Sequence, residues 1–137
     1  MGQTLGLDTT LLIYLLEEHP KYFLPAREIF RSIESGKHSG VFASLGLIEL
    51  LTGPKQLGQY ALANEYKNLI THFPHLIIGD LNEAVIEQAS SLRAEYHIPT
   101  PDAIHLATAI EYGATVFVTN DKRLKKVKQI RIRLIGS

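Results

Sequence analysis

The stretch of residues 100–119 reads TPDAIHLATAIEYGATVFVT and combines a helical pattern with a buried strand. Its first half predicts a helix, because apolar side chains recur at the spacing i, i+3, i+4 and i+7, at Ala103, Leu106, Ala107 and Ile110. Thr100 is the expected N-cap, Pro101 suits the first helical position, and Gly113 ends the helix. The apolar run at residues 115–119 then predicts a strand.

The same alternation of helix and strand extends toward both ends of the chain. Apolar runs predict further strands at residues 3–8, 41–43, 76–78 and 130–134. Helical patterns predict helices at residues 9–18, 25–35, 44–51, 59–71 and 82–96, and we expect Gly53 and Pro54 to end the third of these. Short strands separated by helices imply parallel pairing with right-handed crossovers. The sequence therefore predicts an α/β fold, a three-layer α/β/α sandwich around a central, mostly parallel sheet, in one domain spanning residues 1–137.

The composition is that of an ordinary globular protein. Of the 137 residues, 45% are hydrophobic and 20% are charged, which excludes the disordered and membrane-embedded classes. No cysteine is present, so disulfides, thiolate metal sites and a cysteine nucleophile are excluded. No apolar run approaches the roughly 20 residues of a membrane span, and the N-terminus shows no secretory leader. We expect a cytoplasmic protein that has no membrane partner.

The charges are unevenly distributed, although the formal net charge is +0. Residues 121–133 hold seven of the 14 lysines and arginines and one acid, Asp121, which gives this tail a net charge of +6. Residues 1–120 hold the other seven bases and 13 of the 14 acids, a net charge of −6. Such a separation can draw a polyanion toward one edge of the molecule. The alternative is a solvated basic strand at the end of the chain.

Four acidic residues lie at or near the ends of apolar stretches: Asp8, Glu49, Asp102 and Asp121. Ligands bind at the carboxyl ends of parallel strands, so we expect these acids to meet at one edge of the sheet. Asp102 can reach that edge only if the helix that it opens begins there. Two carboxylates 4 Å apart repel by about 4 kcal/mol at an effective dielectric near 20, and a divalent cation would offset this. Oxygen ligands without cysteine favour Mg²⁺ or Mn²⁺, which suits attack of an activated water on phosphorus.

Each acid also has an ordinary explanation. Asp8 could cap a helix, Asp102 could stabilise a helix dipole, and Asp121 could be a turn residue. Glu49 is harder to explain in this way, because it interrupts an apolar helix. Nearby groups could support an acidic site through hydrogen bonds, namely Thr9, Thr119, Asn120 and His105. For His105, a purely structural role is the alternative.

The segments around the four acids resemble the four signature blocks of the PIN domain, particularly in the small toxin ribonucleases of VapBC-type toxin–antitoxin pairs. These segments are LDTTLLIYLLE, SLGLIELLTGP, TPDAIHLATAI and FVTNDKRL, and together they cover essentially the whole chain. The resemblance implies Mg²⁺- or Mn²⁺-dependent hydrolysis of RNA phosphodiester bonds by a homodimer that a cognate antitoxin inhibits.

The resemblance also implies a role for individual residues. Asp8 and Asp102 would be the principal metal ligands, and Thr119 would support them. Glu49 and Asp121 would complete the acidic cluster and help to orient the attacking water. The basic residues directly after Asp121 would contact the RNA, namely Lys122, Arg123, Lys125 and Lys126.

Other functions remain open on the sequence alone. A phosphoacceptor signalling domain is disfavoured, because Asp8 is followed by Thr9 and Thr10 and not by a second acid. A non-catalytic module could bind RNA or protein through residues 122–133. DNA cleavage is also possible, because nothing resembles a reader of the 2′-hydroxyl group. Apolar side chains within residues 57–71 could form a dimer or antitoxin surface, or could belong to an ordinary covering helix.

Overall fold

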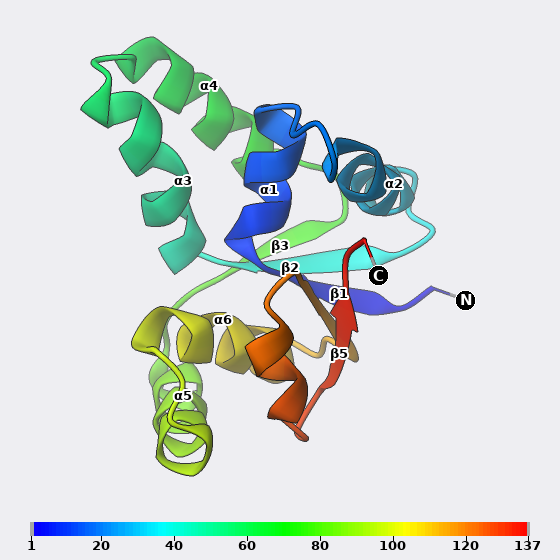
Figure 1. Ribbon diagram of the computed structural model, residues 1–137, viewed down its shortest axis with the longest axis vertical. Coiled ribbons are helices and arrows are strands. Elements are labelled where there is room, and N and C mark those ends of the chain that lie inside the picture. The colour runs from blue at the N-terminus through cyan, green and yellow to red at the C-terminus, as the bar shows by residue number, and fades with distance from the viewer. Residues whose placement is uncertain (1, 137) are drawn as a thin grey trace.

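Five parallel strands form the central sheet of the computed structural model, which describes residues 2–136 (Figure 1). They are β1 (Thr4–Leu7), β2 (Ser39–Ala43), β3 (Leu76–Gly79), β4 (Val116–Thr119) and β5 (Arg131–Leu134). The strand order is β3-β2-β1-β4-β5, and every neighbouring pair is parallel. The predicted parallel sheet is therefore confirmed.

Helices cover both faces of this sheet, so the predicted three-layer architecture is confirmed (Figure 1). One face carries α1 (Thr9–Leu16), α2 (Phe23–Glu34), α3 (Leu45–Gln56) and α4 (Tyr60–Thr71). The other face carries α5 (Glu83–Tyr96) and α6 (Thr100–Glu111), while a short 3₁₀ helix, η1 (Lys122–Lys126), connects β4 to β5. Within residues 2–136, every helix is too short or too polar to cross a bilayer.

Each face of the sheet has its own hydrophobic core. Val116 and Val118 of β4 pack with α1 and α2, whereas Phe117 between them packs with α5 and α6. Successive side chains of a strand point to opposite faces, so a strand that is buried on both faces must be apolar throughout. This explains the continuous apolar run that identified β4 in the sequence.

Three details of the sequence prediction are corrected by the structure. Helix α3 passes through Gly53 and Pro54 and ends at Gln56, because Gly53 has no Cβ to clash with the proline ring and Pro54 is buried. The N-cap of α6 is Pro99 and not Thr100, since the extended Pro99 backbone already separates α6 from α5. The basic run at residues 122–126, which predicted no element, forms η1.

The order of the strands creates a switch point between β1 and β4. From β1 the chain continues outward through β2 and β3, and it then returns to β4 on the other side of β1. Connections that leave in opposite directions open a crevice at the carboxyl ends of the two central strands. Asp8 and Asp121 follow these two ends, and the backbone amide of Asp8 donates to the carbonyl of Val118 at 3.1 Å.

Close packing at Gly6 fixes the distance between β1 and α6. A Cβ atom at Gly6 would lie 2.4 Å from the Cβ of Ala109, which is shorter than any normal contact. Glycine therefore lets α6 lie directly against the sheet. Since α6 leads into β4, its first turn lies at the carboxyl edge of the sheet, and this turn contains Asp102.

We predict that Gly6→Ala destabilises the protein by about 1–3 kcal/mol, because the new methyl group overpacks the contact with α6. Urea unfolding monitored by circular dichroism measures this loss. Ala109→Gly removes the opposing methyl group, so the double variant should be more stable than the sum of the two single effects predicts. Additive effects would show that the contact does not hold α6 in place.

Candidate active site

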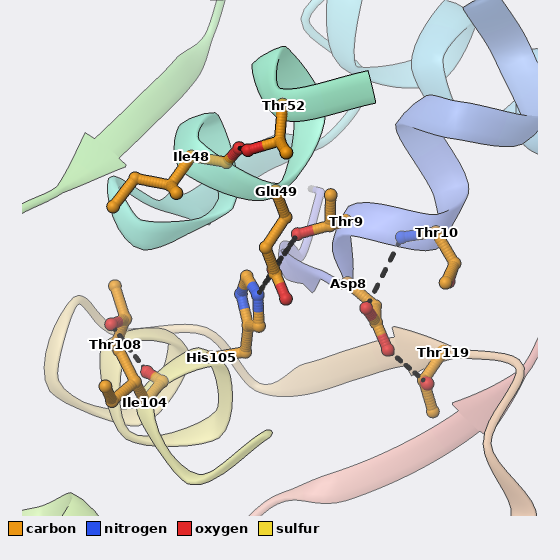
Figure 2. Close-up of polar contacts among 10 residues, drawn as sticks. All are labelled: Asp8, Thr9, Thr10, Ile48, Glu49, Thr52, Ile104, His105, Thr108 and Thr119. Atoms are coloured by element: carbon orange, nitrogen blue, oxygen red, sulfur yellow. Dashed lines mark hydrogen bonds and ion pairs between the residues drawn. The ribbon is translucent and has the colours of Figure 1, made fainter. Parts of the chain in front are cut away.

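Asp8 occupies the turn between β1 and α1 and has partners on both sides. Its Oδ1 accepts a hydrogen bond from the backbone amide of Thr10 at 3.4 Å, so Asp8 is the N-cap of α1. Its Oδ2 accepts a hydrogen bond of 2.7 Å from the hydroxyl group of Thr119 (Figure 2). Capping is thus one part of its role, and the shorter bond joins the ends of the two central strands.

The end of β4 is held by a short chain of hydrogen bonds. The fully buried Thr119 hydroxyl donates to Asp8 and accepts from the backbone amide of Asp121 at 3.1 Å. Asn120 binds no carboxylate among residues 2–136, although a carboxylate was one of the partners that the sequence allowed. Its side-chain amide donates to the hydroxyl group of Tyr14 at 3.1 Å, because Tyr14 on α1 faces this loop. Asn120 therefore attaches the loop to α1.

Arg123 binds the carboxylate of Asp121. The guanidinium donates from Nη2 to Oδ2 at 2.7 Å and from Nε to Oδ1 at 3.0 Å, and the backbone amide of Arg123 donates to Oδ1 at 2.9 Å. These contacts, led by the side-chain bond from Arg123, hold the pKa of Asp121 below its usual range. Lys126 contributes further positive charge. Asp121 is thus ionised and already has a cationic partner.

Asp102 lies in the first turn of α6 and is only partly exposed. No side chain or backbone amide among residues 2–136 donates a hydrogen bond to its carboxylate. Burial raises the pKa of Asp102, and the negative charges of Asp8 and Asp121 raise it further. Asp102 is therefore a carboxylate that lacks a donor and is repelled by two neighbouring acids.

Glu49 joins the site through Thr9 and His105. The Thr9 hydroxyl donates to Glu49 Oε1 at 2.8 Å, and His105 Nε2 lies 2.7 Å from the same oxygen (Figure 2). Thr9 and His105 are buried, whereas 38% of the Glu49 side chain is exposed. The hydrogen bond from His105 lowers the pKa of Glu49, and the bond from Thr9 adds to this effect. Glu49 is thus an oriented, ionised carboxylate.

His105 faces the site, as one of the two sequence hypotheses expected, but its partner is Glu49 and not Asp102. Its ring packs against Phe42, with 6.1 Å between the ring centroids. The buried Nδ1 has no hydrogen-bond partner in the described part of the chain. Because the Glu49 carboxylate oxygen accepts, Nε2 of His105 is the donor in the bond between them.

The donor set fits a loosely held divalent cation better than a closed metal site. Among residues 2–136, no three acidic or histidine side chains are arranged as a ready-made metal site. Mg²⁺ is commonly bound through one or two carboxylates, while waters and substrate phosphates fill its remaining positions. Asp8 and Asp102 can supply such carboxylates, and the unpartnered charge of Asp102 favours a cation there.

The basic residues after Asp121 lie in different surroundings, although all four that were expected to bind RNA are exposed. Arg123 is bound to Asp121, and Lys126 lies near enough to lower the pKa of the same carboxylate. The pKa of Tyr22 is lowered mainly by its side-chain hydrogen bond with Asn120, and the charge of Lys122 adds a small part to this, whereas Lys125 lines a separate hollow. Neither the contact of Arg123 with Asp121 nor the role of Tyr14 was predicted from the sequence. The spacing of Asp121 and Arg123 was the available signal for the first of these.

Comparison with known proteins identifies a family. The family model described as the PIN domain matches residues 6–130, which is most of the chain. Among curated proteins, none is close enough in sequence to count as a relative.

Several solved structures share the fold. VapBC2 from Rickettsia felis, bound to a DNA fragment from its promoter, has a TM-score of 0.75 at 19% identity, and the match covers 97% of this chain and 99% of that chain. DNA-bound VapBC from Salmonella typhimurium has a TM-score of 0.75 at 21% identity, covering 98% of both chains. VapBC-1 from nontypeable Haemophilus influenzae has a TM-score of 0.72 at 18% identity, covering 95% of this chain and 96% of that one. At these identities the likeness is one of fold.

We predict that Asp102→Asn stabilises the metal-free protein at pH 7. The pKa of Asp102 is raised in the folded state, so the folded protein binds a proton on this carboxylate more tightly than the unfolded chain does. Stability therefore falls as the pH rises from the ordinary value of 3.8 through the higher folded pKa. The variant should lack this fall and should gain less than about 1 kcal/mol, since solvent screens a partly exposed carboxylate.

Urea unfolding in EDTA between pH 3 and pH 7 measures this effect. Asp80→Asn is the matched control, because Asp80 is an exposed acid just after β3. A loss of stability in Asp102→Asn at pH 7 would contradict the electrostatic account of the site.

Proposed function

Since this chain belongs to the PIN domain family, we propose that it is a divalent-metal-dependent endoribonuclease of the VapC type, the toxin of a toxin–antitoxin pair. The observation that carries this proposal is the state of Asp102, a partly buried carboxylate that has no donor within residues 2–136 and whose pKa is raised by burial and by the charges of Asp8 and Asp121. Such a group has little reason to remain in a fold unless a cation binds there. Mg²⁺ or Mn²⁺ is the cation that oxygen ligands favour.

In this proposal Asp8 and Asp102 hold the cation, and Asp121 completes the acidic cluster. The bound ion would lower the pKa of a water molecule and offset charge on the scissile phosphate. Thr119 keeps the Asp8 carboxylate in place through its 2.7 Å hydrogen bond and also fixes the backbone of Asp121. A fixed carboxylate needs no reorganisation during the reaction, which favours the transition state.

Glu49 is the residue that we propose to orient the attacking water. Its Oε1 is held by Thr9 and His105, so its orientation is set from within the fold. These same bonds lower its pKa, which keeps Glu49 ionised and able to accept a hydrogen bond from water at neutral pH. His105 would act as a positioning residue, because it touches Glu49 and lies buried behind it.

Arg123 would exchange partners when the substrate binds. Its side chain is 72% exposed, although it is paired with Asp121. An exposed ion pair contributes little stability, so a phosphate group can compete for the guanidinium at low cost. Arg123 would then bind the RNA backbone and release Asp121 toward the cation. Lys122 and Lys126 would add favourable charge for the RNA on the same 3₁₀ helix.

The proposed partners are a cognate antitoxin and a second copy of the chain, in the cytoplasm. Each structural neighbour named above is a VapBC complex, which supports an antitoxin partner. Large apolar side chains are exposed along α3 and α4, where Leu57 is 76% and Tyr60 is 62% exposed. Exposed apolar surface of this kind is typical of a protein interface.

A non-catalytic RNA- or protein-binding module is the second candidate. It is favoured by the ion pair between Arg123 and Asp121, which neutralises one of the four acids. The two candidates differ in their need for metal. A nuclease requires a divalent ion for cleavage, whereas a binding module retains its affinity in EDTA and releases no product.

We predict that Asp8→Asn and Asp102→Asn each reduce RNA cleavage at least about 100-fold, because each removes a carboxylate that holds the cation. Cleavage of labelled single-stranded RNA, transfer RNA and DNA with Mg²⁺, with Mn²⁺ and with EDTA measures the activity. RNA should be cut only with metal present, and DNA should remain intact.

Asp80→Asn controls for loss of an acid at the same edge of the sheet, since Asp80 follows β3. It should cut RNA at the rate of the parent protein. Cleavage by Asp102→Asn at the parent rate would show that the assigned site is wrong, and preferential cutting of DNA would overturn the substrate.

A further inference from the structure

A second, strongly basic feature lies between α2 and the edge strand β5, outside the acidic site. It is a hollow of about 1160 Å³, which we term the β5 groove. Five cationic side chains line it, namely Arg31, Lys37, Lys125, Arg131 and Arg133. Of the acidic residues within 2–136, Glu28 is the one that lines it. A groove with this excess of positive charge suits an anionic ligand.

The two arginines of β5 define the floor of the β5 groove. Ile132 packs into the core beneath α5 and α6, so Arg131 and Arg133 on either side of it point to the opposite face. Both arginines are exposed. A sheet face that a helix covers is normally apolar. Charged residues at these positions indicate that this part of the sheet is meant to remain accessible to solvent or to a ligand.

Within residues 2–136, the cations of the β5 groove form no ion pair with an acidic side chain. Among residues 2–136, ion pairs form between His105 and Glu49 and between Arg123 and Asp121, and neither involves this groove. Charged side chains on an edge strand can serve only to prevent pairing with another strand. Protection of an edge strand can explain Arg131 and Arg133. It cannot explain Arg31 of α2, Lys37 of the following loop and Lys125 of η1, which line the same hollow.

The β5 groove adjoins the proposed active site through η1. Lys125 lines the groove, while Arg123 and Lys126 of the same short helix act on Asp121. One helical turn therefore borders both places. Several separate charges along a strand suit an extended chain of phosphates better than a single small anion.

We propose that the β5 groove binds the phosphodiester backbone of single-stranded RNA on one side of the cleaved bond. This inference rests on the proposed nuclease function and adds a path for the substrate beyond the acidic site. The groove contributes affinity without reading sequence, because backbone contacts carry no base information. An extended acidic peptide is the competing occupant that the charges also permit.

The test measures RNA binding without cleavage. Fluorescence anisotropy of a labelled 20-nucleotide single-stranded RNA of mixed sequence is recorded in EDTA over a series of salt concentrations. The variants are Arg131→Gln with Arg133→Gln, and Lys37→Gln with Lys125→Gln. The matched control is Lys55→Gln with Lys67→Gln, which removes the same charge from exposed lysines outside the β5 groove. Thermal unfolding confirms that each protein is folded.

We expect each groove variant to bind RNA at least about tenfold more weakly than the control variant. The slope of log affinity against log salt should fall by about 1.4, because two phosphate contacts are lost at roughly 0.7 each. The second groove variant alters only exposed side chains on the rim, so the test survives if the change on β5 disturbs folding.

Three outcomes would overturn the β5 groove proposal. The first is a parent protein that does not bind RNA, and the second is groove variants that bind as the control does. The third is that binding of a poly-glutamate peptide requires Arg131 and Arg133, whereas binding of RNA does not. Because EDTA prevents cleavage, binding lost only in the groove variants would support the groove even if no nuclease activity is found. If the protein cleaves RNA with metal but the groove variants bind RNA as tightly as the control, the nuclease proposal stands and the β5 groove proposal is wrong.

Discussion

The parallel pairing of β1 with β4 is the constraint on which the rest of the structure depends. These strands are neighbours in space although more than 100 residues separate them in the chain. Their pairing brings Asp8 next to Thr119, and the 2.7 Å bond between these side chains connects the two strand ends. The close contact of Gly6 with α6 then positions Asp102 at the same edge. The acidic site is thus a consequence of topology and packing.

The electrostatics of this site are only partly balanced within the protein. Glu49 and Asp121 each have a partner that lowers their pKa, namely His105 and Arg123. Within residues 2–136 no group donates a hydrogen bond to Asp102, and burial and its acidic neighbours raise the pKa of its carboxyl group more than the charges of Arg123 and His105 lower it. The remaining negative charge is what we propose a divalent cation offsets. The β5 groove is the opposite case, because its cations form no ion pair with an acidic side chain among residues 2–136 and would attract an anion.

The sequence predicted the architecture because buried strands and amphipathic helices have different periodicities. The run from Val116 to Thr119 is apolar since both faces of β4 are covered, and this signal is local. The passage of α3 through Pro54 and the contact of Arg123 with Asp121 were not predicted. The first depends on the burial of Pro54, and the second on the shape of η1. Neither is encoded by periodicity.

The candidate acids were identifiable for the same reason, since charge at the end of an apolar run is conspicuous. The hydrogen-bond partners of these acids were harder to predict from the sequence, because the bond between His105 and Glu49 joins residues 56 positions apart. Whether Asp102 holds a divalent cation is tested by titrating the metal-free protein with Mn²⁺ and following free Mn²⁺ by electron paramagnetic resonance. We predict saturable binding that is weakened at least tenfold in Asp102→Asn and unchanged in Asp80→Asn. Equal Mn²⁺ binding by the parent protein and both variants would show that Asp102 does not hold the cation.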